Sequence, residues 1–205
     1  PVTEGAIRLD GTDLKAMPED ELRNRIGMVP QKAVLFKGTI RSNLQWGKPD
    51  ATEEEMWQAI DVAQAREVVE GKDGKLDARV AQNGKNLSGG QRQRLTIARA
   101  LVRKPEILIL DDSASALDYA TDAKLRAALR ELEGNTTTFI VSQRASTIRH
   151  ADKIIVLDDG EMAGIGTHDE LMKDCEVYKE IYYSQYPEER LKAEAAARKG
   201  GNQNG

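Results

Sequence analysis

The sequence predicts an α/β fold, a mainly parallel sheet with flanking helices, and two kinds of segment lead to this prediction. Glu106–Asp112 holds a continuous apolar run and Thr136–Ser142 is a second apolar segment, and both are typical of strands buried on both faces of a parallel sheet. Segments with the 3.6-residue apolar period of amphipathic helices lie before and between them. Strands that alternate with helices in this way build α/β sheets.

The first thirty residues are expected to contribute two strands and a helix. Gly5–Gly11 alternates as a short strand does and ends in a turn. Met17–Arg25 is predicted to be an acidic helix with Pro18 near its first turn, where proline is tolerated. Ile26–Gln31 is predicted to be an apolar strand that Pro30 stops.

The stretch Ala33–Arg103 is mostly helical and is expected to form an insertion at the rim of the sheet. Thr52 and Glu55 have the spacing of a capping box at the start of one helix, and apolar residues follow at helical intervals. Both tryptophans, Trp46 and Trp57, are expected to pack inside this helical region.

The C-terminal part is expected to alternate between helices and strands. A helix is predicted over about Thr121–Glu133. Asp152–His168 is predicted to be a hairpin around an Asp159–Gly160 turn, because these residue types favour tight hairpin turns. Two short helices follow, and Pro187–Gly205 is predicted to be a charged helix that fades into a disordered tail.

The composition fits one globular domain and argues against several classes of function. Of 205 residues, 40% are apolar and 31% are charged. The net charge of −4 and the aromatic share of only 4% argue against a nucleic-acid partner. Cys175 is the only cysteine, so the sequence predicts no internal disulfide and no cysteine-based metal site. No apolar run approaches the length of a membrane span.

A short polar turn opens the helix predicted over Ser88–Arg103. Ser88 and Gln91 have capping-box spacing. Gly89 and Gly90 leave backbone N–H groups accessible at the positive end of the helix, which is a ready site for an anion. Taken alone, the turn is more often an ordinary capped helix with a flexible entry.

Two carboxylates follow the apolar run that begins at Ile107. Asp111 is expected at the carboxyl end of a buried strand, where α/β sheets bind their ligands, and a carboxylate there can hold Mg²⁺ directly or through water. Asp112 would then face the space of a nucleophilic water. The alternative for these two residues alone is a strand that ends in an acidic turn.

These motifs, in this order, resemble the nucleotide-binding domain of ABC transporters, and Leu35–Leu44 is similar to the exporter branch in particular. The resemblance covers most of the chain, from Thr3 to about Ser184. The matching segments are the Q-loop glutamine Gln31, the loop Ala78–Gln82 that touches the transmembrane couplers, the signature Leu87–Gln91, the Walker B strand Ile107–Asp111 and the D-loop Ser115–Asp118.

The resemblance implies a P-loop NTPase core with a helical subdomain, and it assigns ATP and Mg²⁺ as cofactors. Residues 1–186 would form the C-terminal portion of the ATP-binding domain, with the helical and signature subdomain at 33–103, the core at 104–186 and an extension at 187–205. The implied site residues are Gln31, Ser88, Gly89, Gly90, Gln91, Asp111 and Asp118 for nucleotide, Gln31 and Asp111 for metal, and Asp112 and Gln143 for catalysis.

Three departures from the family pattern affect this interpretation. The Walker A loop, which in the family lies before the position of Pro1, is absent, so we expect a truncated domain that binds ATP poorly by itself. The family's catalytic glutamate is here Asp112, one methylene shorter. The switch histidine is here Gln143, which can donate a hydrogen bond to a phosphate but cannot carry a proton.

Family members pair two such domains head to tail, and each ATP lies between the Walker motifs of one domain and the signature of the other. The resemblance therefore implies a second nucleotide-binding domain, expected to be a different subunit, and a transmembrane domain at the cytoplasmic face of the cell membrane. Asp112 and Gln143 would weaken the chain's own site, whereas the signature would complete the partner's competent site. Sequence drift in a homodimer is the alternative, and ATPase activity is expected only in the full-length dimer.

Two other functions stay open on the sequence alone. A soluble ABC ATPase of DNA repair or translation is disfavoured, because only 55 residues without heptads separate Gln31 from Leu87 and because the chain is acidic. A non-functional fragment is the other alternative.

Overall fold

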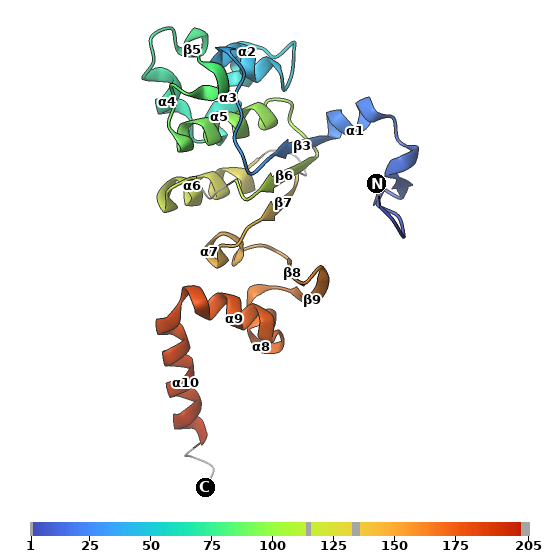
Figure 1. Ribbon diagram of the computed structural model, residues 1–205, viewed down its shortest axis with the longest axis vertical. Helices are drawn as coiled ribbons and strands as arrows, with labels where there is room; N and C mark the ends of the chain where they lie inside the picture. Colours follow the sequence, from blue (N-terminus) through green and yellow to red (C-terminus); the bar gives the residue numbers. More distant parts are fainter. Residues whose placement is uncertain (1, 114–115, 133–135, 202–205) are drawn as a thin grey trace. The chain divides into compact units, whose positions relative to one another are not determined.

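The computed structural model describes residues 2–113, 116–132 and 136–201, and it divides the chain into two compact units. The first unit comprises residues 1–141 and the second residues 142–205. Figure 1 traces the helices and strands of each unit.

A three-stranded parallel sheet is the centre of the first unit. Its strands are β3 (Ile26–Val29), β6 (Ile107–Asp111) and β7 (Thr137–Val141), with β6 in the middle. Helix α6 (Tyr119–Arg130) connects β6 to β7, as parallel pairing requires. The predicted α/β class with a parallel sheet is therefore confirmed.

The N-terminal elements precede this sheet. They are a small hairpin of β1 (Arg8–Leu9) and β2 (Thr12–Asp13), one turn of 3₁₀ helix η1 (Leu14–Ala16) and helix α1 (Glu19–Arg25). The strand expected over residues 5–11 is thus only the first arm of a hairpin. The acidic helix is confirmed, and its proline occupies the N-cap position.

A helical bundle forms the rest of the first unit and gathers around α5 (Gly89–Leu101), as Figure 1 shows. Its other elements are α2 (Ile40–Gln45), α3 (Glu53–Val62), α4 (Arg66–Glu70), the 3₁₀ turns η2 (Lys75–Asp77) and η3 (Gln82–Gly84), and the two-residue pair β4 (Gly38–Thr39) and β5 (Arg79–Val80). The capping box predicted for α3 is present, with the Thr52 hydroxyl accepting from the Glu55 N–H. We call these elements the bundle.

One continuous apolar core joins the bundle to the inner face of the sheet. Ile60 of α3 and Ile97 of α5 are completely buried, and so are Val29 and Leu108 of the sheet. The apolar stripes of α3 and α5 meet in this core, and their burial is what holds helices of 10 and 13 residues in place.

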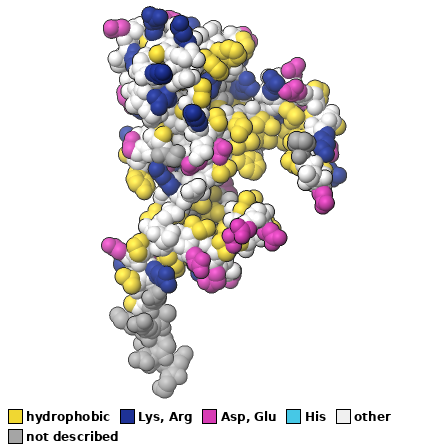
Figure 2. All heavy atoms as spheres, in the orientation of Figure 1, with side chains coloured by type: hydrophobic (Ala, Val, Ile, Leu, Met, Phe, Trp, Pro, Cys, Tyr) yellow, Lys and Arg dark blue, Asp and Glu magenta, His cyan; other side chains and the backbone are white. Residues whose placement is uncertain are grey.

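The outer face of the sheet is exposed, and this corrects the prediction that its strands are buried on both faces. Met28, Phe139 and Val141 are all more than half exposed, and β6 alternates between buried and partly buried positions. The pleat sends alternate side chains to opposite faces, and among the described residues of this unit only one face is covered. Figure 2 shows hydrophobic side chains uncovered over this sheet.

The second unit packs helices on one face of a hairpin. Strands β8 (Ile154–Asp158) and β9 (Glu161–Gly166) pair antiparallel around the predicted turn, whose residues have positive φ as such turns require. The helices are α7 (Ala145–Ile148), α8 (His168–Asp174), α9 (Glu176–Gln185) and α10 (Pro187–Gly201). In the described part of the chain, every helix is too short or too polar to span a membrane.

Candidate functional site

The signature turn is built as a capping box. The Ser88 hydroxyl accepts from the Gln91 N–H at 3.2 Å, and the Gln91 side-chain oxygen accepts from the Ser88 N–H at 3.0 Å. The predicted N-cap is thus confirmed. Because the two side chains satisfy each other's backbone donors, the turn has a fixed conformation without a ligand.

The two glycines of the turn have different surroundings. A Cβ added at Gly89 would meet nothing within 4 Å, so the backbone of this first helical residue is open to an approaching group. A Cβ at Gly90 would lie 3.2 Å from the carbonyl oxygen of Ala116, so Gly90 permits close contact with the D-loop segment. An open helix terminus of this kind suits an anion.

Two side chains tie the turn to the segment before it. The guanidinium of Arg92 donates to the carbonyl oxygen of Leu87 at 2.7 Å. The Asn86 amide accepts from the Ala81 N–H at 2.9 Å and donates to the carbonyl of Arg79 at 2.8 Å. Asn86, the residue before the signature, is therefore hydrogen-bonded to the loop 78–82 that the resemblance assigns to transmembrane contact.

The acidic edge of the sheet brings together residues that are far apart in the sequence. Val29 pairs with Leu110, so Gln31 and Asp111 follow at the same edge of neighbouring parallel strands. The Gln31 side-chain N–H donates to the Asp112 carboxylate at 3.3 Å. This hydrogen bond brings together two residues that are 81 positions apart in the sequence.

Asp112 has an unusual backbone conformation. Its φ of 42° lies in the left-handed region, which aspartate tolerates better than most residues with a Cβ. Its N–H donates to the carbonyl of Val141 at 2.9 Å, which fixes the turn after β6 to the end of β7. The backbone thus holds the Asp112 carboxylate at the carboxyl edge of the sheet.

Asp118 serves as the N-cap of α6. Its carboxylate accepts from the N–H and the hydroxyl of Thr121 at 2.9 and 2.8 Å. These hydrogen bonds lower the pKa of Asp118, because they favour the charged form. The Asp118 side chain, for which a nucleotide-binding role is predicted, therefore already caps a helix. Ser115, the first residue of the predicted D-loop, lies outside the described residues.

Gln143 belongs to the second unit and lies just before α7. Its backbone carbonyl accepts a hydrogen bond from the side chain of Gln185 at 2.8 Å. The sequence analysis missed Gln185, because the contact spans 42 residues and leaves no periodic signal.

Trp46 also differs from the expectation. It is 66% exposed and packs against the ring of Phe36 with centroids 4.9 Å apart, so the prediction that it packs inside the bundle is wrong. Trp57 does contact the core, and the guanidinium of Arg66 lies 5.0 Å from its ring. An exposed aromatic pair is a signal that only the structure supplies.

The residues present fit the implied cofactors. The capped turn with an open Gly89 suits a phosphate. Gln31 and Asp111 at one sheet edge supply oxygen donors, and Mg²⁺ is commonly held by one or two such side chains together with substrate phosphates. Among the described residues, no cluster of three or more His, Cys, Asp or Glu side chains could hold a metal ion without such help.

The fold, the open signature turn and the acidic sheet edge define a class, an α/β nucleotide-binding domain with an accessory helical bundle. The family model described as ABC transporter matches residues 1–115, more than half of the chain, and the chain belongs to the ABC transporter family.

Two relatives match about nine-tenths of the chain. An uncharacterized ABC transporter ATP-binding protein of Mycobacterium tuberculosis is 49% identical over 187 residues, which are 90% of this chain and 32% of that protein. The β-(1→2)glucan export ATP-binding/permease protein NdvA of Rhodopseudomonas palustris is 47% identical over 182 residues, 89% of this chain and 30% of that protein. The chain thus spans about a third of the length of these relatives.

A solved structure has the same fold. It is titled as a bacterial Atm1-family ABC exporter with ATP bound, and it is 36% identical with a TM-score of 0.85. The similarity covers 89% of this chain and 32% of that one. The predicted family and fold class are thereby confirmed.

Proposed function

We propose that the chain is the ATP-binding part of an ABC exporter and couples ATP binding and hydrolysis to export across a membrane, working on its cytoplasmic face. The observation that carries the proposal is the signature turn, capped by Ser88 and Gln91 and open at Gly89. Similarity to proteins named as exporters adds support.

The signature turn would act on a nucleotide held by a second nucleotide-binding domain. The open N–H groups at the start of α5 would bind phosphate oxygens, and the capping box would keep them in place before the nucleotide arrives. Groups that are already oriented need no reorganisation when charge develops, which is how such donors accelerate phosphoryl transfer.

The chain's own Walker motifs would form the weaker of two sites. Asp112 and Gln143 replace the family's longer carboxylate and its titratable switch residue. Gln31 and Asp111 would hold Mg²⁺, which when bound neutralises phosphate charge. The Gln31 amide that now donates to Asp112 would turn its oxygen toward the ion. The partner would therefore be a different subunit with the stronger site.

Contact with the transmembrane part would involve Ala78–Gln82. Asn86, which immediately precedes the signature turn, is hydrogen-bonded to Ala81 and Arg79 of this segment, so a displacement of the segment would be transmitted to the turn. The exposed pair of Phe36 and Trp46 offers a second contact, because large aromatic side chains at a surface are typical of protein interfaces.

A matched pair of variants tests the signature. Ser88→Ala and Thr52→Ala each remove the hydroxyl of a capping box with the same 3.2 Å bond, so each should cost about 1 kcal/mol of stability. Only Ser88→Ala should also lower ATP turnover of the assembled transporter, by about 10²-fold. Equal turnover in the two variants would contradict the proposal.

A second set of variants tests whether this chain's own site is the weaker of the two nucleotide sites. In the Ser88→Ala background the partner's site is disabled, so the remaining turnover reports on this chain's own site. Adding Asp112→Glu and Gln143→His together should raise that turnover, at most by the roughly 10²–10⁴-fold that one positioned acid-base group supplies. An unchanged rate would mean that these two residues do not limit the site.

A further inference from the structure

The loop that carries the switch position is held by one side chain from a distant helix. The Gln185 side-chain oxygen accepts from the Ala145 N–H at 2.9 Å, and its N–H₂ donates to the Gln143 carbonyl at 2.8 Å. Both contacts go to backbone atoms. Gln185 is the last residue of α9, 40 and 42 positions away along the chain.

The geometry of the loop explains why a glutamine fits. Arg144 is extended, with φ −93° and ψ 113°. In an extended segment the carbonyl before a residue and the N–H after it point the same way. One planar amide, with its oxygen and its N–H₂ side by side, satisfies both groups as a neighbouring strand would.

The helix that carries Gln185 is itself well anchored. Tyr178 and Tyr182 of α9 are buried, and the Tyr178 hydroxyl lies 2.9 Å from the His168 ring nitrogen Nδ1. The Tyr182 hydroxyl donates to Glu189 of α10 at 2.7 Å. Ile148, at the end of α7, packs against the same apolar cluster as Tyr178. The switch loop therefore lies on a fixed support.

We infer that Gln185 is a positioning residue for the switch position. It holds the backbone of residues 143–145 so that the side chain at 143 leaves the loop in one direction. This inference rests on the proposed function, because residue 143 matters only if it meets a nucleotide phosphate. It adds to that function a dependence of the switch on the C-terminal helices α9 and α10.

Exchange of backbone amides tests the hydrogen bonds directly. In Gln185→Met, which keeps the length of the side chain and loses both bonds, hydrogen–deuterium exchange of the peptide 142–148 in the assembled transporter should be about tenfold faster. Gln185→Glu keeps the acceptor, so the Ala145 amide should stay protected. Ser184→Ala is the matched control, because its hydroxyl bonds only within α9, to Ile181. Unchanged exchange in Gln185→Met would overturn the inference.

ATP turnover tests whether the position matters. In the Ser88→Ala background, where the remaining turnover reports on this chain's own site, Gln185→Met should lower kcat about fivefold and leave KM for ATP within about twofold, because a residue that acts on the switch affects the chemical step. With Gln143→Ala added to that background, Gln185→Met should have no further effect on kcat. A full additional loss there, or no loss in the Ser88→Ala background alone, would overturn the positioning role while leaving the exchange result intact.

The two proposals fail in different ways. If Ser88→Ala leaves turnover unchanged, the proposed function fails, whatever Gln185 does. If Ser88→Ala lowers turnover by about 10²-fold and Gln185→Met leaves both exchange and the remaining kcat unchanged, only the inference about Gln185 fails.

Discussion

The bundle and the sheet of the first unit bury their apolar side chains to different degrees. In the bundle, α3 and α5 pack against each other and α5 packs against β3, and residues such as Ile60 and Ile97 have no exposure at all. The sheet is covered on its inner face only, and Met28 and Phe139 remain exposed on the other. The difference separates two tasks. The bundle supplies a preformed signature turn, whereas the sheet supplies an edge that carries the polar side chains of Gln31, Asp111 and Asp112.

The largest expected effect on stability comes from shortening one apolar side chain to alanine in each region. Ile60→Ala in the bundle should lower the free energy of unfolding by about 2–5 kcal/mol, because it opens a cavity in a closed core. Met28→Ala on the outer face of the sheet should change it by less than about 0.5 kcal/mol. Urea unfolding followed by tryptophan fluorescence measures both, and similar losses would show that the two regions are equally packed.

Replacing one of two glycines by alanine is expected to give the next largest effect on stability. A Cβ at Gly47 would lie 2.1 Å from the carbonyl oxygen of Arg99 and 2.8 Å from Val102, so Gly47→Ala should cost about 1–3 kcal/mol through overpacking. Gly89→Ala meets nothing within 4 Å and should leave stability within about 0.5 kcal/mol. Thermal unfolding would decide, and a stable Gly47→Ala variant would mean that the bundle can shift to make room.

The stability of the second unit is expected to depend on pH through His168, which adds a third region to the comparison. Burial and then the nearby Arg149 lower the pKa of His168, while Asp169 and Glu189 act against this and His150 adds to it. The unfolded chain therefore binds the proton more readily. The stabilising contribution is complete above about pH 6.5, the pKa of an unperturbed histidine, and is lost as the pH falls below it.

We expect the free energy of unfolding of the second unit to fall as the pH is lowered from about 7.5 to about 5.5. The His168→Gln variant should lose most of this pH dependence. His150→Gln is the control variant. Urea unfolding followed by far-UV circular dichroism at each pH measures this free energy. If its dependence on pH persists in His168→Gln, another group is responsible for the pH dependence.

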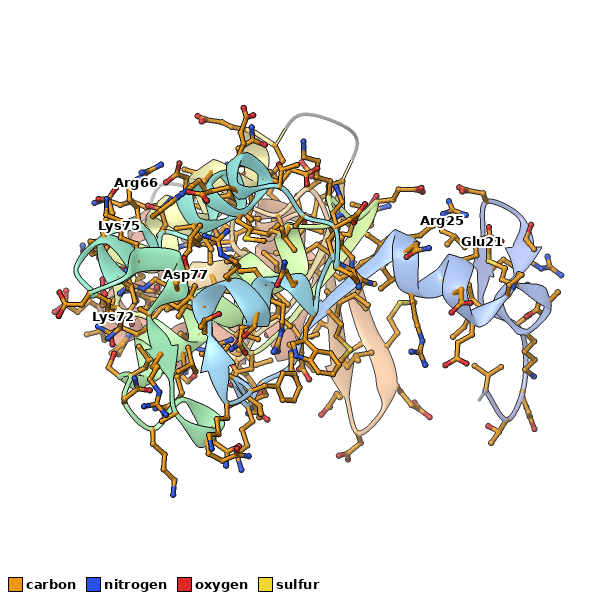
Figure 3. All side chains as sticks on the ribbon, turned by 90° about the horizontal axis from the view of Figure 1, so that it is seen from above. Glu21, Arg25, Arg66, Lys72, Lys75 and Asp77 are labelled. Carbon is orange, nitrogen blue, oxygen red and sulfur yellow. The ribbon has the colours of Figure 1, made fainter. Side chains whose placement is uncertain are left out.

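The smallest effect is expected at the exposed surface of the bundle. Arg66 pairs with Asp61 at 2.6 Å and Glu70 at 2.9 Å, yet its side chain is 49% exposed. Figure 3 labels Arg66 on the side of the bundle that faces away from α1. Arg66→Gln should therefore cost less than about 1 kcal/mol, and less still at high salt. A larger loss would mean that its contact with Trp57 contributes more than the ion pairs.

A comparable arginine on the sheet side gives the contrast. Arg25 of α1, labelled in Figure 3, bonds to Glu106 at 2.7 Å and also to Asp10, and its side chain is only 19% exposed. It joins the N-terminal hairpin to the start of β6. Arg25→Gln should thus cost more than Arg66→Gln in the same unfolding assay, and the reverse order would contradict the burial argument.

Local patterns predicted the bundle well. The capping boxes at Thr52 and Ser88 and the apolar stripes between them are signals within a few residues, and α3 and α5 begin where those signals place them. The order of strands and helices likewise predicted a mainly parallel sheet, although not which strands pair in it.

Contacts at long range could not be predicted in the same way. The apolar run of β7 indicates a strand, but it carries no information on whether both faces are covered. The pair β4–β5 has two residues per strand, too few for a period. The exposed side chain of Trp46 depends on what packs around α2. The resemblance assigned Gln31 and Asp112 to one nucleotide site, and this assignment stays a prediction. The hydrogen bond between them spans 81 positions, so no local pattern could have predicted it.

The hydrogen bonds from Gln185 to the backbone of residues 143 and 145 have a consequence for how this sequence can evolve. Both hydrogen bonds from the Gln185 side chain to this loop go to main-chain atoms, so neither bond depends on the side chain at position 143. A histidine could become a glutamine, or revert, by a single replacement that needs no compensating change elsewhere in the scaffold. The identity of the side chain at this position is therefore separable from the folding of the loop that carries it.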